Sequence, residues 1–155
     1  MLDLSYDDRA IVVRMHPAPA LTLGLLESLL AALAYVGPER AVVLTGTGAV
    51  FAPDLEPTAE ARRCLPRVLA ALRAHPMPIV AAINGDAVGA GYALARAADA
   101  RIMSSGVIRF PARAYPPPAA VAAGLVERRC APGELIELAL SRAARPRAGV
   151  CVPAS

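Results

Sequence analysis

PIVAAINGDAVGAGYALARAADARI, residues 78–102, carries the strongest structural signal in the chain. It opens with an uncharged apolar run at residues 79–83, which is typical of a strand that is covered on both faces. Asn84-Gly85 follows, and Gly89-Ala90-Gly91 then begins a predicted helix over residues 89–98. Small residues at a helix start let the backbone approach a ligand, and the unpaired N–H groups there can bind a developing negative charge. The segment predicts oxyanion-hole architecture or, as the simpler alternative, only tight packing of a helix on a sheet.

Strand and helix patterns alternate on both sides of this segment. Apolar residues recur at helical spacing within residues 21–36 and 65–72, and proline-containing breakers follow both patterns. Short strands are predicted at residues 2–6, 11–15, 41–44, 101–103 and 107–110. The order of hairpin, helix, strand, helix, strand, helix and strand calls for a parallel sheet with crossover helices, so the predicted fold class is α/β.

The last third of the chain is less regular. Residues 116–118 are three consecutive prolines and are predicted to be stiff and non-helical, whereas residues 134–142 have the pattern of a short helix. A chain of 155 residues has room for one core but hardly for two. We therefore predict a single domain over residues 1–144 and a flexible tail at 145–155.

The composition argues against several classes of function. All 16 basic residues are Arg, the net charge is only +3 and aromatic residues make up 4%, so nucleic-acid binding is not expected. No apolar run is long enough to span a bilayer, and the start MLDLSYDD is acidic where a signal peptide would be basic, so we expect a cytoplasmic protein without membrane association. The spacing of Cys64, Cys130 and Cys151 fits neither a disulfide framework nor a zinc signature, and no metal site is predicted.

Three blocks of sequence follow one another in an informative order. They are AVVLTGTGAVF at residues 41–51, PIVAAINGDAVGAG followed by YALARAADARI at residues 78–102, and AAGLVERRCAPGEL at residues 122–135. Together they resemble the enoyl-CoA hydratase/isomerase (crotonase) family. The resemblance implies a ββα spiral fold that binds acyl-CoA thioesters and stabilises their enolate with two backbone N–H groups. It also implies a lyase or isomerase of fatty acid metabolism that forms trimers, has no permanently bound cofactor and meets coenzyme A as part of its substrate.

The resemblance assigns the two oxyanion donors to positions in this chain. Ala90 supplies one N–H group. The sequence leaves the second donor open between two alignments with the family. If Asp54-Leu55 is aligned with the family's Asp-Leu, Pro53 stands at the donor position and has no N–H. If the alignment contains no gap, the donor is Leu55. The residues expected around the thioester and its coenzyme A are Ala52, Pro53, Asp54 and Gly89.

The acid/base residues of the family are missing. Hydration of an enoyl thioester needs two positioned carboxylates, one to deliver water and one to deliver a proton. The family has one Glu three residues after the oxyanion donor, where this chain has Ala93, and a second just after the strand that ends at Phe110, where it has Pro-Ala-Arg-Ala at 111–114. The chain is also shortened after residue 114, so a truncated C-terminal helical region is expected and the trimer is doubtful. Two-Glu hydration is expected to be weak or absent.

Some polar residues have two interpretations. Asp86 could be a substitute acid or base, but a cap of the following helix is the simpler role. Asp54 and Glu56 are expected to be solvated loop carboxylates, and Tyr92 and Tyr115 packing residues.

Two other functions are open. A crotonase-derived scaffold or pseudoenzyme would also lack both Glu residues. The spacing G-x-x-x-G-x-G after a strand further resembles the cofactor turn of NAD(P)-binding short-chain dehydrogenases, but this chain has no Lys for the Tyr-Lys pair of that family.

Overall fold

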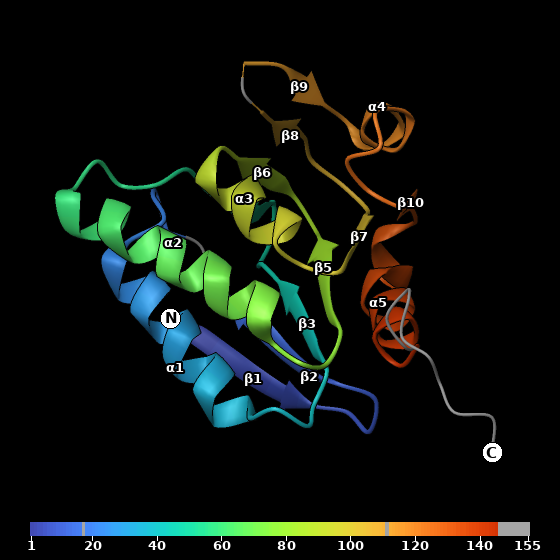
Figure 1. Ribbon diagram of the computed structural model, residues 1–155. Coiled ribbons are helices and arrows are strands. Elements are labelled where there is room, and N and C mark those ends of the chain that lie inside the picture. Colours follow the sequence, from blue (N-terminus) through green and yellow to red (C-terminus); the bar gives the residue numbers. More distant parts are fainter. Residues whose placement is uncertain (17, 111, 146–155) are drawn as a thin grey trace.

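Within residues 1–16, 18–110 and 112–145, which the computed structural model describes, the chain forms two sheets flanked by helices (Figure 1). The strands are β1 (Leu2–Tyr6), β2 (Ile11–Met15), β3 (Val42–Thr45), β4 (Val50–Ala52), β5 (Ile79–Ile83), β6 (Asp86–Val88), β7 (Ala100–Met103), β8 (Ile108–Arg109), β9 (Ala114–Tyr115) and β10 (Arg128–Arg129). The helices are α1 (Leu23–Val36), α2 (Ala59–Ala74), α3 (Ala90–Arg96), α4 (Pro117–Ala122) and α5 (Leu135–Ala143), with a 3-10 turn at Pro132–Glu134. No helix in these ranges combines the length and the apolar character needed to cross a membrane.

Repeated units of two strands and a helix build the two sheets. β3, β4 and α2 form one unit, and β5, β6 and α3 form the next. The first strand of each unit joins the larger sheet, of order β1-β2-β3-β5-β7-β10, and the second joins the smaller sheet, of order β4-β6-β8-β9. β2, β3, β5 and β7 run parallel, and β1 pairs antiparallel at the edge. The predicted α/β class and ββα arrangement are confirmed.

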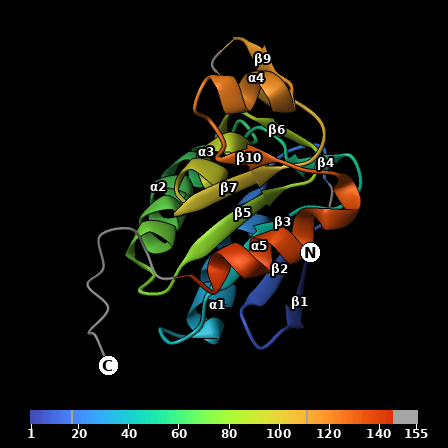
Figure 2. The ribbon, with the colours of Figure 1, turned by 90° about the vertical axis from the view of Figure 1, so that its right-hand side faces the viewer.

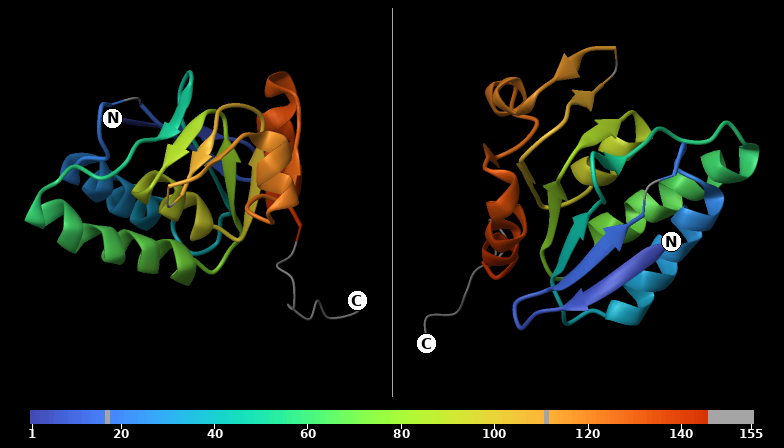
Figure 3. Two further views of the ribbon diagram at one scale, coloured as in Figure 1. Left: turned by 90° about the horizontal axis from the view of Figure 1, so that it is seen from above. Right: turned by 180° about the vertical axis from the view of Figure 1, so that it is seen from behind.

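The larger sheet is covered on both faces. All five residues of β5 are buried, as the uncharged run predicts. Ile79, Ala81 and Ile83 pack in the cluster that contains α1 and α2, whereas Val80 and Ala82 pack with α5. Figures 1 and 2 show these helices on opposite sides of the sheet, and Figure 3 shows the same layers from above and from behind. Each fully buried aliphatic side chain contributes roughly 1.5–3 kcal/mol, so the double-sided core is a main source of stability.

Asn84 connects the end of β5 to the turn between β3 and β4. Its Oδ1 accepts a hydrogen bond from the N–H of Gly46 at 2.9 Å. Its Nδ2 donates to the carbonyl oxygens of Gly48 at 3.0 Å and Val50 at 3.2 Å. An amide side chain suits this place because it offers an acceptor and two donors at once. The Asn84-Gly85 motif therefore holds the point where the chain leaves the larger sheet for the smaller one.

The prediction of a non-helical segment at residues 116–118 is wrong. α4 begins at Pro117, and Pro117 and Pro118 occupy its first turn. N–H groups there have no partner within the helix, so proline is tolerated and its fixed φ suits the helix. Some element boundaries also differ: the strand predicted at 107–110 covers only Ile108–Arg109, and the helix predicted at 89–98 covers Ala90–Arg96. The strands predicted at 41–44 and 101–103 differ by one residue from β3 and β7. The short helix predicted at 134–142 is confirmed by α5, while nearly all of the predicted tail, residues 146–155, lies outside the described residues.

Candidate functional site

The predicted site residues meet where two strands of the smaller sheet end. β4 ends at Ala52 and leads into the loop of residues 53–58, and β6 ends at Val88 and leads through Gly89 into α3. β4 and β6 pair in parallel, with Ala52 opposite Ala87. Because parallel neighbours end at the same edge of a sheet, the 53–58 loop lies beside the start of α3. Ligands of α/β folds commonly bind beyond the carboxyl ends of parallel strands.

Two backbone N–H groups from these segments point at one oxygen atom. The N–H of Leu55 donates to Asp54 Oδ1 at 2.8 Å, and the N–H of Ala90 donates to the same atom at 3.0 Å. Leu55 and Ala90 lie 35 positions apart in the chain, so the fold alone brings them together. The sequence leaves the second donor open between Pro53 and Leu55. Of these two, Leu55 has the N–H that donates to the same oxygen, Asp54 Oδ1, as the N–H of Ala90.

Glycines allow the close approach of α3 to the 53–58 loop. A Cβ on Gly91 would collide with the backbone carbonyl of Ala52. Gly89 has φ +53°, and a Cβ there would lie 2.5–2.8 Å from the carboxylate atoms of Asp54. The Gly-Ala-Gly start of α3 is thus required both for the packing and for the space that Asp54 fills.

Contacts with the segment before α1 anchor the 53–58 loop. The N–H of Leu21 donates to the carbonyl oxygen of Asp54 at 2.8 Å, and the N–H of Glu56 donates back to that of Leu21 at 3.1 Å. The Glu56 carboxylate accepts the N–H of Leu23, the first residue of α1, at 2.7 Å. The prediction of solvated carboxylates is therefore wrong for Glu56, and Asp54, although exposed, is engaged by Leu55 and Ala90.

Asp86 does not cap α3, which is the simpler of the two roles that the sequence predicts for it. It is the first residue of β6, and its Oδ1 accepts the N–H of Val107 at 2.9 Å, ahead of β8. The prediction that it caps α3 is wrong, because the side-chain acceptor at the first N–H of α3 is Asp54. Asp86 thus ties β6 to the segment that leads into its neighbouring strand.

The segment around the first of the two missing Glu positions lies in α3 and packs through Tyr92. Ala93 lies in α3, one turn after Ala90, and carries no group that can move a proton. Tyr92 is buried, stacks at a tilt on Phe110 with ring centroids 5.4 Å apart, and donates its hydroxyl to the carbonyl of Leu125 at 3.2 Å. Burial raises the pKa of the Tyr92 hydroxyl. Tyr92 is a packing residue, as predicted.

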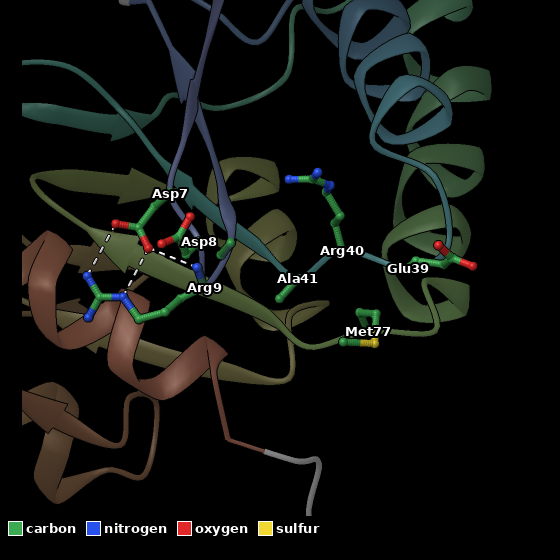
Figure 4. A pocket seen from close by; sticks show the side chains of 8 residues that line it. Asp7, Asp8, Arg9, Glu39, Arg40, Ala41 and Met77 are labelled. Atoms are coloured by element: carbon green, nitrogen blue, oxygen red, sulfur yellow. Dashed lines mark hydrogen bonds and ion pairs between the residues drawn. The ribbon is translucent and has the colours of Figure 1, made fainter.

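A polar cavity of about 370 Å³ lies at the opposite end of the larger sheet, just before β2, β3 and β5 begin (Figure 4). Its wall carries both signs of charge, with Asp7 and Glu39 beside Arg9 and Arg40. Arg9 donates to Asp7 at 3.0 Å and, through Nη1, to Glu137 of α5 at 2.6 Å. Figure 4 shows the Arg9 side chain turned toward Asp7. The cavity therefore borders a salt bridge that fastens α5 to the end of the β1–β2 hairpin.

The attachment of α5 is expected to weaken in acid. Hydrogen bonds from Arg9 lower the pKa of both Asp7 and Glu137. Their contribution to stability is present above the carboxyl pKa of the unfolded chain, about 4, and is lost as the pH falls through the lower folded-state values. The effect is small and salt-sensitive because Glu137 is exposed and Arg9 and Asp7 are each about one third exposed. We expect the hydrogen-exchange protection factors of α5 to fall below about pH 4, and Arg9→Ala to remove that pH dependence; equal protection of α5 at all pH values would contradict this.

A model of the family described as Enoyl-CoA hydratase/isomerase matches residues 10–112, which is well over half of the chain. This chain belongs to that family. The "Probable enoyl-CoA hydratase echA6" of Mycobacterium tuberculosis is 41% identical over 85 residues, covering 51% of this chain and 35% of that protein. The "Probable enoyl-CoA hydratase echA12" of Mycobacterium leprae is 33% identical over 127 residues, covering 68% and 43%. This member of the enoyl-CoA hydratase/isomerase family thus spans less than half the length of the curated relatives it matches.

Solved structures of the family share the fold. An enoyl-CoA hydratase from Bacillus anthracis has a TM-score of 0.81 at 23% identity, over 92% of this chain and 74% of that one. An enoyl-CoA hydratase/isomerase family protein from Silicibacter pomeroyi has a TM-score of 0.80 at 21% identity, over 96% and 86%. The predicted family and its crotonase-like fold are confirmed, and they replace the alternative of a dinucleotide-binding fold.

Proposed function

We propose that this protein binds acyl-CoA thioesters and polarises their carbonyl oxygen with the N–H groups of Leu55 and Ala90. The observation that carries the proposal is the convergence of both N–H groups on one oxygen, Asp54 Oδ1. That carboxylate oxygen stands in for the thioester oxygen, which gains negative charge as an enolate forms. One preorganised donor of this kind typically contributes about 3 kcal/mol to transition-state stabilisation. Coenzyme A then takes part only as the carrier of the acyl group.

Family membership supports the substrate class, since the relatives are described as probable enoyl-CoA hydratases. The chemistry of the site limits the reaction. Ala93 and the Pro-Ala-Arg-Ala segment at 111–114 provide no carboxylate at the two positions where the family carries Glu. Proton delivery and water activation each require a positioned acid or base. We therefore propose thioester binding and enolate stabilisation with little or no two-Glu hydration.

The experiment is a thermal-shift titration with a short saturated acyl-CoA, with free CoA as reference. A ligand that binds only the native state stabilises it by about 2.7 kcal/mol at roughly 100 times its Kd. We expect the acyl-CoA to raise Tm by roughly 5–10 °C, more than free CoA does. No rise with either ligand would overturn the proposal and favour the non-enzymatic scaffold. A steady-state assay with a short enoyl-CoA is expected to show very slow hydration, and robust turnover would contradict that second part.

A further inference from the structure

We infer that Asp54 is an internal competitor for the acyl-CoA site: its carboxylate occupies the position of the thioester oxygen and must leave before a thioester can bind. This inference rests on the proposed function, because it takes Leu55 and Ala90 as the donors. It goes beyond that function by assigning to one side chain of this chain the control of thioester affinity.

The contacts of Asp54 are those of a ligand within the proposed site. A single atom, Oδ1, accepts both N–H groups, at 2.8 Å from Leu55 and 3.0 Å from Ala90. Hydrogen bonds to an ionised acceptor are stronger than those between neutral groups. A thioester oxygen that approaches the same two donors therefore meets a charged competitor that is already bound.

The surroundings of Asp54 allow its carboxylate to bind between the two N–H groups and also to be displaced from them. The carboxylate lies in the space that a Cβ at Gly89 would fill, with its atoms 2.5–2.8 Å from that Cβ position. Asp54 is nevertheless an exposed residue, so a displaced carboxylate can pass into water without burying its charge. Its backbone stays in place meanwhile, because the carbonyl of Asp54 accepts the N–H of Leu21. The side chain can thus exchange with a ligand while the Leu55 donor keeps its position.

Competition of this kind lowers affinity in a selective way. The apparent Kd of a ligand rises in proportion as the binding-competent fraction of the protein falls. Only a ligand that places an oxygen between the two N–H groups meets the competitor. Free CoA has no thioester carbonyl and can bind through its nucleotide and pantetheine parts with Asp54 in place.

The test measures the affinities of butyryl-CoA and free CoA by titration calorimetry for the wild type and three variants. Asp54→Ala removes the competitor, so we expect butyryl-CoA to bind about tenfold or more tightly and free CoA to change by less than about twofold. Asp54→Asn keeps an oxygen but loses the charge, so its butyryl-CoA affinity is expected to lie between those of the wild type and Asp54→Ala. Glu60→Ala is the matched control, since it removes an exposed carboxylate at the start of α2 that lies 3.9 Å from the Arg63 guanidinium, and no change is expected.

The outcomes separate the inference from the proposed function. Butyryl-CoA binding that is equal in the wild type and both Asp54 variants would leave the function standing and overturn the inference. Failure of all four proteins to bind either ligand would overturn both. A ligand-free measurement is independent of this: the amide proton signals of Leu55 and Ala90 are expected to shift in Asp54→Ala. Unchanged signals would show that the carboxylate does not hold these groups and would also overturn the inference.

Discussion

Replacing Ala90 by Pro is expected to abolish the extra stabilisation that an acyl-CoA gives over free CoA, with the fold intact. Ala90 is the first residue of α3, a position where proline is well tolerated because the N–H has no partner within the helix. The substitution therefore removes the proposed donor, together with its hydrogen bond to Asp54, and leaves the helix hydrogen bonds of α3 in place. Loss of a hydrogen bond to a charged or polarised oxygen costs about 1.5–3 kcal/mol, so acyl-CoA affinity should fall about tenfold or more.

The matched control is Ala90→Gly, which keeps the N–H. For each protein we compare the Tm with acyl-CoA to the Tm without ligand. This difference should be close to the same for Ala90→Gly and the wild type. An Ala90→Pro variant that folds and shows the full acyl-CoA rise would remove Ala90 from the proposed site.

Gly91→Ala is expected to cause the largest loss of stability among small substitutions near the site. A Cβ at Gly91 would collide with the carbonyl of Ala52, which is backbone and cannot simply rotate away. Either α3 or the 53–58 loop must move, and overpacking of this kind costs about 3 kcal/mol. The same movement separates Leu55 from Ala90, so acyl-CoA binding should be lost along with stability. Chemical denaturation of the wild type and the variant gives the difference in the free energy of unfolding.

Gly133→Ala is the control for Gly91→Ala. A Cβ at Gly133 meets open space, and a substitution of this kind is expected to change the free energy of unfolding by less than about 0.5 kcal/mol. If Gly91→Ala were as mild as Gly133→Ala, the close contact between α3 and the β4 end would not be a requirement of the fold.

Much of the architecture could be predicted from local patterns. The uncharged run at residues 79–83 predicts a strand buried on both faces because only such a strand can be apolar at every position, and β5 has this burial. The helical spacing within residues 21–36 likewise predicts α1. The prediction that residues 116–118 are non-helical is wrong because proline breaks a helix in its interior but not in its first turn.

The candidate site was less predictable, since its geometry depends on how distant segments pair. The sequence pattern predicts that Ala90 lies at a helix start, but the choice between Pro53 and Leu55 depends on the parallel pairing of β4 with β6. The same pairing brings Asp54 to Ala90, and nothing local distinguishes Asp54 from a solvated loop carboxylate. Asp86 follows Asn84-Gly85 directly, and its position in the sequence predicts a helix cap. In the structure it lies at the start of β6, and its carboxylate accepts the N–H of Val107 instead.

The crystal structure of the complex with butyryl-CoA tests the central claim most directly. We expect a thioester oxygen within about 3 Å of both the Leu55 and the Ala90 nitrogen, with the Asp54 carboxylate turned out of that position. A bound thioester whose oxygen faces neither N–H group, with Asp54 still holding both, would contradict it.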